Sequence, residues 1–596
     1  MKTIFPFLCR PAWRWLMLAL LTVFSLNVSA DSVINSVHNL SANGPGTIKA
    51  TSMTNSCIFC HAVHHASGVT PLWNHSMSSV SNYVVYSSTR LNNMNLVIPQ
   101  PNGSSRLCLS CHDGTIALGS VSSGAPQIPM QNGVTTMPGG SAANLGTDLS
   151  ADHPISFVYD SALATAARDP DSADPSLSAV YDPTKLSTPA VKVDSQSRLQ
   201  CTSCHDPHNN QYGNFLVVPT ASELCVVCHR ENSWGTSAHA MSQTPVPPSI
   251  LSKLAATSRP GSKASSSTVS SKTMQAVGCE ACHITHQAGA KKHLLQQAAP
   301  EQNCLNCHNG ATAKKDIAAD FQKISIHPIT LSSDAHSPDE DPINPQVRHV
   351  VCADCHNAHA DNAQKAAAPN ATGALAGLTG VTIAGTVIKP LTKEYELCFR
   401  CHADSSARGP ALVSRQFPQN NTRLQFASAN QSFHPVETIG KNQASVPSLI
   451  EPWKTTSVMY CTDCHNSDSS PAAGGSGPNG PHGSIYRPIL ERNLDLLDNQ
   501  PESTSAYALC YKCHDRNVVL SNQSFRYHES HVVNDKAACT TCHDSHGVAN
   551  APHLINFNTT YVTPGSLGTV RYQSTGNFKG TCTLMCHGYD HKNTSY

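Results

Sequence analysis

The spacing of its cysteines constrains this chain more than any other feature of its 596 residues. All 25 cysteines except Cys9 form twelve pairs, and a histidine directly follows the second cysteine of each pair. Eleven pairs have the form C-x-x-C-H: Cys57 and Cys60, Cys108 and Cys111, Cys201 and Cys204, Cys225 and Cys228, Cys279 and Cys282, Cys304 and Cys307, Cys352 and Cys355, Cys398 and Cys401, Cys461 and Cys464, Cys510 and Cys513, and Cys539 and Cys542. The twelfth, Cys582-x-x-x-Cys586-His587, has one extra residue. We number these sites 1 to 12; their motif histidines are His61, His112, His205, His229, His283, His308, His356, His402, His465, His514, His543 and His587.

C-x-x-C-H is the attachment sequence of haem c. Each thiol adds across one haem vinyl group, and the adjacent imidazole takes one axial position of the iron. On a helical turn, positions i, i+3 and i+4 share one face, so both sulfurs and the imidazole meet the same porphyrin. Zinc is the competing interpretation, but tetrahedral zinc sites do not require a histidine after every second cysteine. We therefore expect about twelve covalently bound haems.

The N-terminus has the pattern of a secretory signal peptide. Lys2, Arg10 and Arg14 precede an apolar run from Leu16 to Leu26, which is followed by the small-residue site Val28-Ser29-Ala30. This pattern predicts cleavage after residue 30, so that residues 1–30 are a leader. A membrane anchor is the alternative, but the apolar run has about 11 residues and a span needs about 20. We expect an exported protein with no transmembrane helix after cleavage.

A second histidine pattern alternates along the chain. Odd-numbered sites carry another histidine three residues after the motif histidine, which we call the +3 histidine: His64, His208, His286, His359 and His546. At site 9 this place is taken by Asp468, and His482 is the nearest substitute. A further histidine, the upstream histidine, precedes each odd site: His38, His153, His239, His327, His434 and His531. The repeat therefore supplies twelve candidate distal ligands for twelve irons.

A +3 histidine follows its own proximal ligand on the same face, so it is not able to reach the opposite axial position of its own haem. We expect it to bind a neighbouring iron, the other one of its pair. Mainly bis-histidine, low-potential haems follow, since an axial methionine would raise the potential. Eight histidines stay unassigned: His65, His75, His293, His336, His349, His528, His553 and His591. Among them His528 competes with His531, and His591 lies close enough to site 12 to be a ligand.

The repeat divides the chain into six dihaem modules, at residues 31–145, 146–235, 236–315, 316–420, 421–520 and 521–596. About 47 residues per haem are too few for an independent core of ordinary size. The haems must then serve as the core and staple the chain together. We expect an irregular, haem-cored fold with short helices at the C-x-x-C-H sites and long coil connections. A few strands are expected near Tyr83 to Tyr86 and Tyr561 to Tyr572.

One stretch of sequence resembles a known family. Cys201-Thr-Ser-Cys-His-Asp-Pro-His208, followed by Asn214-Phe-Leu216 and Glu223-Leu-Cys225-Val-Val-Cys-His229, is similar to the multihaem (dodecahaem) c-type cytochromes with doubled C-x-x-C-H motifs of metal-reducing bacteria. The resemblance spans most of residues 35 to 591 but lies in the motifs. It implies an electron conduit in the periplasm or on the outer cell surface, active in extracellular electron transfer to metal or other acceptors. Its implied partners are other cytochromes or redox proteins, including an outer-membrane porin–cytochrome assembly.

Charge and ligand count bear on the class of function. The 39 basic and 39 acidic residues balance, and loss of the three basic residues of the leader leaves a slightly acidic chain. Such a chain lacks the excess of basic residues that is typical of proteins that bind nucleic acid. A reductase for nitrite, hydroxylamine or a sulfur oxyanion is the alternative, and it needs one iron with an open axial position. Because the spare histidines suffice to occupy the second axial position of every iron, we expect an electron carrier and not an enzyme. Sites 9 and 12 are the least regular, and polymerisation into haem filaments stays open.

Overall fold

The computed structural model describes residues 32–64, 72–123, 127–168, 178–230, 233–257, 272–329, 343, 350–405, 411–441 and 446–596. The predicted leader and the histidines at positions 65, 336 and 349 lie outside these residues. None of the helices in the described ranges is long and apolar enough to cross a membrane.

The helices are short, because Ser, Thr, Asn, Gly and Pro interrupt every apolar run and favour caps and turns over helix interiors. They are α2 (Thr89–Asn93), α3 (Gly103–His112), α4 (Ser161–Ala166), α5 (Cys201–Cys204), α6 (Ala221–Cys228), α7 (Ala238–Met241), α8 (Pro248–Thr257), α9 (Met274–Val277), α10 (Pro300–Leu305), α11 (Ile317–Asp320), α12 (Cys352–Cys355), α13 (Glu394–His402), α14 (Thr422–Gln425), α15 (Arg516–Leu520) and α16 (Cys539–Cys542). At odd sites the motif forms a single turn of its own, as in α5, α12 and α16. At sites 2, 4 and 8 it ends a longer helix, α3, α6 and α13.

Most strands form two-residue ladders. β1 (Val84–Val85) runs parallel to β2 (Asp148–Leu149), and three antiparallel ladders join β3 (Ser325–Ile326) to β7 (Gly483–Ser484), β4 (Gly380–Val381) to β5 (Val387–Ile388), and β6 (Ser432–Phe433) to β8 (Gly547–Val548). The larger sheet is antiparallel and C-terminal: β11 (Lys579–Cys586) pairs with β9 (Val562–Thr563), β10 (Arg571–Gly576) and β12 (Tyr589–Ser595). β1, β9 and β10 confirm the strands predicted near Tyr83 and Tyr561.

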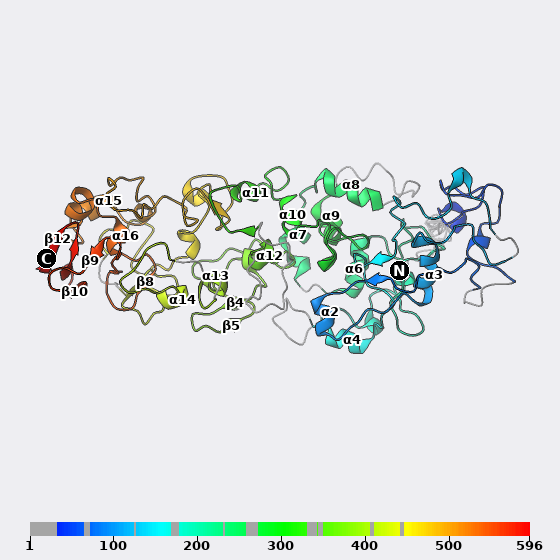
Figure 1. Cartoon of the computed structure of the whole chain (residues 1–596), viewed down its shortest axis with the longest axis horizontal. Coiled ribbons are helices and arrows are strands. Elements are labelled where there is room, and N and C mark those ends of the chain that lie inside the picture. The colour runs from blue at the N-terminus through cyan, green and yellow to red at the C-terminus, as the bar shows by residue number, and fades with distance from the viewer. Residues whose placement is uncertain are drawn as a thin grey trace, which may run out of the picture.

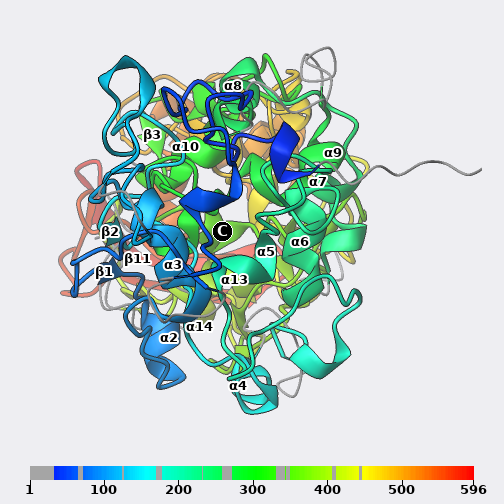
Figure 2. The same cartoon turned by 90° about the vertical axis from the view of Figure 1, so that its right-hand side faces the viewer.

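The chain advances along one long axis in the order of its sequence. Figure 1 shows α3 and α6 toward one end, α12 and α13 near the middle, and α16 with the C-terminal sheet at the other end. Seen from the end in Figure 2, the outline is rounded, with the later elements lying behind the earlier ones. The fold therefore presents its sites one after another.

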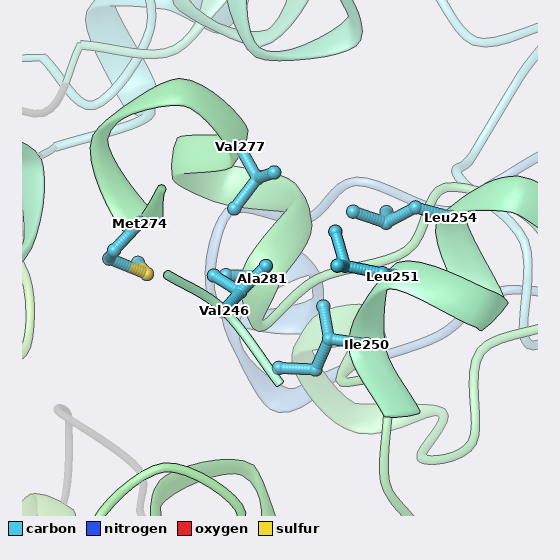
Figure 3. Close-up of a cluster of buried hydrophobic side chains, with 7 residues drawn as sticks. All are labelled: Val246, Ile250, Leu251, Leu254, Met274, Val277 and Ala281. Atoms are coloured by element: carbon cyan, nitrogen blue, oxygen red, sulfur yellow. The ribbon is translucent and has the colours of Figure 1, made fainter. Parts of the chain in front are cut away.

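The hydrophobic cores in the described part of the chain are small and separate, and motif cysteines pack against most of them. One cluster is formed mainly by side chains of α8 and α9 (Figure 3). Its members are Val246, Ile250, Leu251, Leu254, Met274, Val277 and Ala281, and Cys282 and Cys307 pack against them. At the other end of the chain, Phe557, Val562 and Leu584 pack with Cys542, Cys582 and Cys586. Such sparse regular structure around the motifs confirms the predicted irregular fold, whereas the six-module division remains a prediction.

Candidate haem sites

At sites 1 to 11 the motif forms the predicted helical turn. The backbone N–H of the motif histidine donates to the carbonyl of the first cysteine at sites 1, 3 to 7 and 9 to 11, with distances such as 2.8 Å for His61 and 3.0 Å for His205. At sites 2 and 8 the whole motif lies within α3 and α13. At site 12 the prediction of a helical turn is wrong, because Cys582 and Cys586 lie in strand β11.

Each of these eleven motif histidines has a second histidine nearby. In ten cases the two ring centres lie 6.1–6.4 Å apart: His61 with His208, His112 with His38, His205 with His286, His229 with His153, His283 with His359, His308 with His239, His356 with His482, His402 with His327, His465 with His546, and His543 with His528. At site 10, burial and then the charge of nearby His434 lower the pKa of His514 to about 4.

The separation of the rings fits an iron between them. Two imidazoles that bind opposite sides of one metal ion, each with a metal–nitrogen distance of about 2 Å, have ring centres about 6 Å apart. The donor chemistry also fits, because two imidazoles and two cysteines per site are the groups that haem c uses. The residues present are therefore those that would hold the cofactor.

Many of these rings use Nδ1 to reach a backbone carbonyl. Nδ1 of His112 lies 2.7 Å from the carbonyl of Ala143, and Nδ1 of His205 lies 2.7 Å from that of Asn214. The facing histidines do the same: Nδ1 of His327 lies 2.8 Å from the carbonyl of Pro481. Since a carbonyl only accepts, Nδ1 carries the proton and Nε2 is left as the metal-binding nitrogen. This hydrogen bond is the usual support of a histidine that binds a metal.

Burial keeps these imidazoles neutral. It lowers the pKa of the motif histidines His205, His283 and His543 to about 4. It also lowers the pKa of two facing histidines, His38 to about 4 and His482 to about 3. Neutral imidazole is the form that binds a metal, so these rings are ready to act as ligands at neutral pH.

The facing histidines follow a rule that crosses the module boundaries. The upstream histidine faces the motif histidine of the even site in its own module, as His153 faces His229. The +3 histidine, in contrast, faces the odd site of the preceding module, as His286 of site 5 faces His205 of site 3. The expectation that a +3 histidine faces the other site of its own module is therefore wrong. Packing between consecutive modules places its ring beside the earlier odd site.

Three positions depart from the predicted set of facing residues. His64 belongs to the first module, which has no predecessor, and its side chain is exposed outside these pairs. His528, which the sequence left unassigned, faces His543, while the upstream histidine His531 faces His591 with ring centres 6.1 Å apart. The sequence had offered His528 as a competitor of His531 and His591 as a candidate ligand at site 12.

Site 9 shows why its +3 histidine is dispensable. Asp468 stands in that place and forms an ion pair with Lys323, whose Nζ lies 2.8 Å from Asp468 Oδ1 and 2.6 Å from the buried Asp320. His482 supplies the missing ring instead and faces His356 at 6.1 Å. The substitution that the sequence suggested is thus the arrangement found in the fold.

The remaining described histidines have other partners. His75 is fully buried, and both its ring nitrogens lie near carbonyls, Nδ1 at 2.9 Å from Ser76 and Nε2 at 3.2 Å from Ala117. His293 and His553 provide backbone carbonyls that accept from Nδ1 of His283 and His543. Sequence reasoning missed this support, although both residues have a left-handed backbone in equivalent loops.

Contacts between cysteines order the sites along the chain. The first cysteine of an even site lies beside that of the next odd site, close enough for the two thiols to raise or lower each other's pKa: Cys108 with Cys201, Cys225 with Cys279, Cys304 with Cys352, Cys398 with Cys461, and Cys510 with Cys539. The second cysteines of an odd site and the next even site lie close enough for their charges to interact: Cys60 with Cys111, Cys204 with Cys228, Cys282 with Cys307, Cys355 with Cys401, Cys464 with Cys513, and Cys542 with Cys586. Every site thus adjoins the next one in sequence.

A continuous cavity connects the first seven of these sites. Its volume is about 2720 Å³, and both cysteines and the motif histidine of each of sites 1 to 7 line it. The facing histidines His38, His208 and His482 line it too. Packed protein interiors have few voids larger than a water molecule. A cavity of this size along the motifs therefore fits a row of large apolar prosthetic groups.

The comparisons agree with this chemistry. Two segments, residues 193–233 and 273–313, match the family model of the doubled CXXCH motif. They contain sites 3 and 4 and sites 5 and 6. The CXXCH motifs indicate a multihaem c-type cytochrome with covalently bound haem c. No curated protein is significantly similar to the chain.

Proposed function

We propose that this cytochrome is an exported electron conduit that carries about twelve haems, mainly with two axial histidines each, and passes electrons along its length. The observation that supports this most is the unbroken succession of neighbouring sites, from Cys60 and Cys111 at one end to Cys542 and Cys586 at the other, each pair near enough for electrostatic interaction. A row of adjoining sites on one long axis (Figure 1) suits transfer between partners at the two ends.

The chain's own residues have three roles in this function. The cysteines fix each cofactor covalently, and contacts such as that of Cys225 with Cys279 hold successive sites side by side. The paired imidazoles would hold the haem iron and leave no place on it for a substrate, which would favour electron transfer over binding of a substrate. When bound, haem supplies a reversible one-electron couple between ferric and ferrous iron. The small apolar clusters around the cysteines limit access of water and help to keep the potentials stable.

Export, location and partners are part of the proposal. The leader pattern at residues 1–30 supports export, and the resemblance to cytochromes of metal-reducing bacteria supports a place in the periplasm or on the outer surface. The electron acceptors would be metals or other extracellular oxidants, reached directly or through other cytochromes and a porin–cytochrome assembly. Two propionates per haem make the loaded protein acidic, so a partner with a basic surface would be steered toward it.

One experiment separates this function from that of a reductase. Haem is counted by intact-protein mass and pyridine haemochrome, and the oxidised protein is examined by electron paramagnetic resonance with and without nitrite or hydroxylamine. About twelve haems with low-spin signals alone support the conduit. A stoichiometric high-spin signal that shifts with either compound would overturn it in favour of a reductase. A protein without covalent haem would refute both.

A further inference from the structure

Site 12 is built on a β-hairpin. Cys586 pairs with Tyr589 across β11 and β12, and the two residues between them, His587 and Gly588, form the turn. Their φ values are +48° and +76°, as a two-residue type I′ turn requires. The motif histidine of this site therefore lies at the tip of a hairpin, whereas those of sites 1 to 11 end a helical turn.

The ring of His587 already has a partner for the nitrogen that would bind iron. Nε2 of His587 lies 3.0 Å from Oδ2 of Asp498, whose side chain is fully buried. The other carboxylate oxygen of Asp498 accepts a hydrogen bond of 2.6 Å from the N–H of Ala538 and another from the hydroxyl of Thr541. These two donors lie at the start of α16, which carries site 11. His587 thus ties the hairpin to the preceding site.

A different histidine occupies the place of a proximal ligand. His591 faces the upstream histidine His531, with ring centres 6.1 Å apart and planes inclined by 21°. In the earlier modules the upstream histidine faces the motif histidine of the even site, as His239 faces His308 at 6.1 Å. His531 follows the same rule if His591, and not His587, is the histidine of site 12.

The hairpin also explains how His591 shares a face with the cysteines. On a strand, side chains two residues apart point to the same side, so Cys582, Leu584 and Cys586 form one row. His591 is the cross-strand partner of Leu584, and directly paired residues share a face. His587 follows Cys586 directly and leaves that face. The extra residue of the twelfth motif therefore goes with a change from helix to strand.

We propose that His591 is the proximal axial ligand of the haem c attached to Cys582 and Cys586, with His531 opposite, and that His587 is a positioning residue. This inference rests on the proposed function, because it takes site 12 to be a haem site. It makes the chain's twelfth ligand pair independent of the histidine in its attachment motif.

The test compares His591→Asn with the matched variant His587→Asn in the full-length, haem-loaded protein. Both variants are examined by intact-protein mass for haem count and by electron paramagnetic resonance for spin state. His591→Asn should give one high-spin haem per chain, and the high-spin haem of His591→Gly should return to low spin when imidazole is added. His587→Asn should leave its attached haems low-spin.

The opposite pattern contradicts the inference. A fully loaded His591→Asn protein with low-spin haems alone would overturn it, as would a high-spin haem in fully loaded His587→Asn. Failure of the proposed function is distinguishable, because it would show in the parent protein as missing covalent haem or a high-spin signal. A normal parent with a low-spin His591→Asn variant would reject the ligand assignment alone.

Discussion

His208 belongs to site 3, yet its ring faces His61 of site 1, with ring centres 6.1 Å apart and planes inclined by 20°. The same relation joins His359 to His283 and His546 to His465. Each module thus completes the odd site of the module before it. A histidine supplied to the preceding module in this way joins consecutive modules, so each module in the middle of the row depends on both its neighbours.

The first prediction compares two histidines in equivalent motif positions. His208→Ala should open one axial position at site 1 and produce one high-spin haem per chain, because its ring is the one that faces His61. His64→Ala is the matched control and should keep every haem low-spin, since its exposed side chain lies outside the imidazole pairs. Electron paramagnetic resonance of both oxidised variants is the measurement. Identical spectra for the two variants would contradict the assignment.

The second prediction concerns the substitute histidine of site 9. His482→Ala should open site 7 and give one high-spin haem, because His482 faces His356. Asp468 is not able to replace the lost ring, since it is held by Lys323 at 2.8 Å. The control is Asp468→Asn, which should leave the spin state unchanged. A high-spin signal in the control with none in His482→Ala would exclude the pairing.

The sequence predicted which histidines lie opposite a motif histidine better than it predicted the partner of each. The three-residue spacing marked His208 and His286 as candidate ligands, but the rings that they face belong to the preceding module and lie many residues earlier, so no local pattern encodes the pairing. His528 caps a π-helical segment at residues 529–534 and His531 lies within it, so the two are neighbours and spacing did not decide between them.

Site 12 was the main error, and its cause is local. The motif predicted a helical turn, yet His587 and Gly588 adopt two consecutive left-handed conformations, which favour a hairpin. Long-range strand pairing with β9 and β10 then decides the conformation of Cys582 and Cys586. The glycine after His587 was the available signal, since Gly at the second position of a two-residue turn is typical of hairpins.

The third prediction is a pH-dependent potential near sites 8 and 9. Glu394 begins α13, which carries site 8, and its side chain lies close to Thr462 of site 9. Burial, with a smaller effect of the Asp463 charge, raises the pKa of Glu394 to about 7. Ionisation near pH 7 adds a negative charge that favours ferric iron. The midpoint potentials of the nearby haems should therefore fall as the pH rises from 6 to 8, by tens of millivolts.

Glu394→Gln should remove this pH dependence and raise the potentials at pH 8. Spectroelectrochemical titration measures both, with Glu451→Gln as a control that removes an exposed carboxylate, 78% accessible. The same ionisation affects stability. Between pH 4.5 and 7 the folded state binds more protons than the unfolded state, so the free energy of unfolding should decrease as the pH rises. Potentials of Glu394→Gln that keep the parent's pH dependence would contradict this role.

The fourth prediction is that the chain does not fold without its cofactors. The apolar clusters in the described part of the chain are small, three residues in the one around Leu584, and the cysteines pack directly against them. Burial on this scale does not offset the conformational entropy of ordering so much coil. Protein made without haem attachment should lack the helical circular dichroism of the loaded protein and be digested by a protease at least tenfold faster. A haem-free chain that resists digestion as well as the holoprotein would mean that the polypeptide forms a stable core without haem. The fold alone would then bring the paired histidines together.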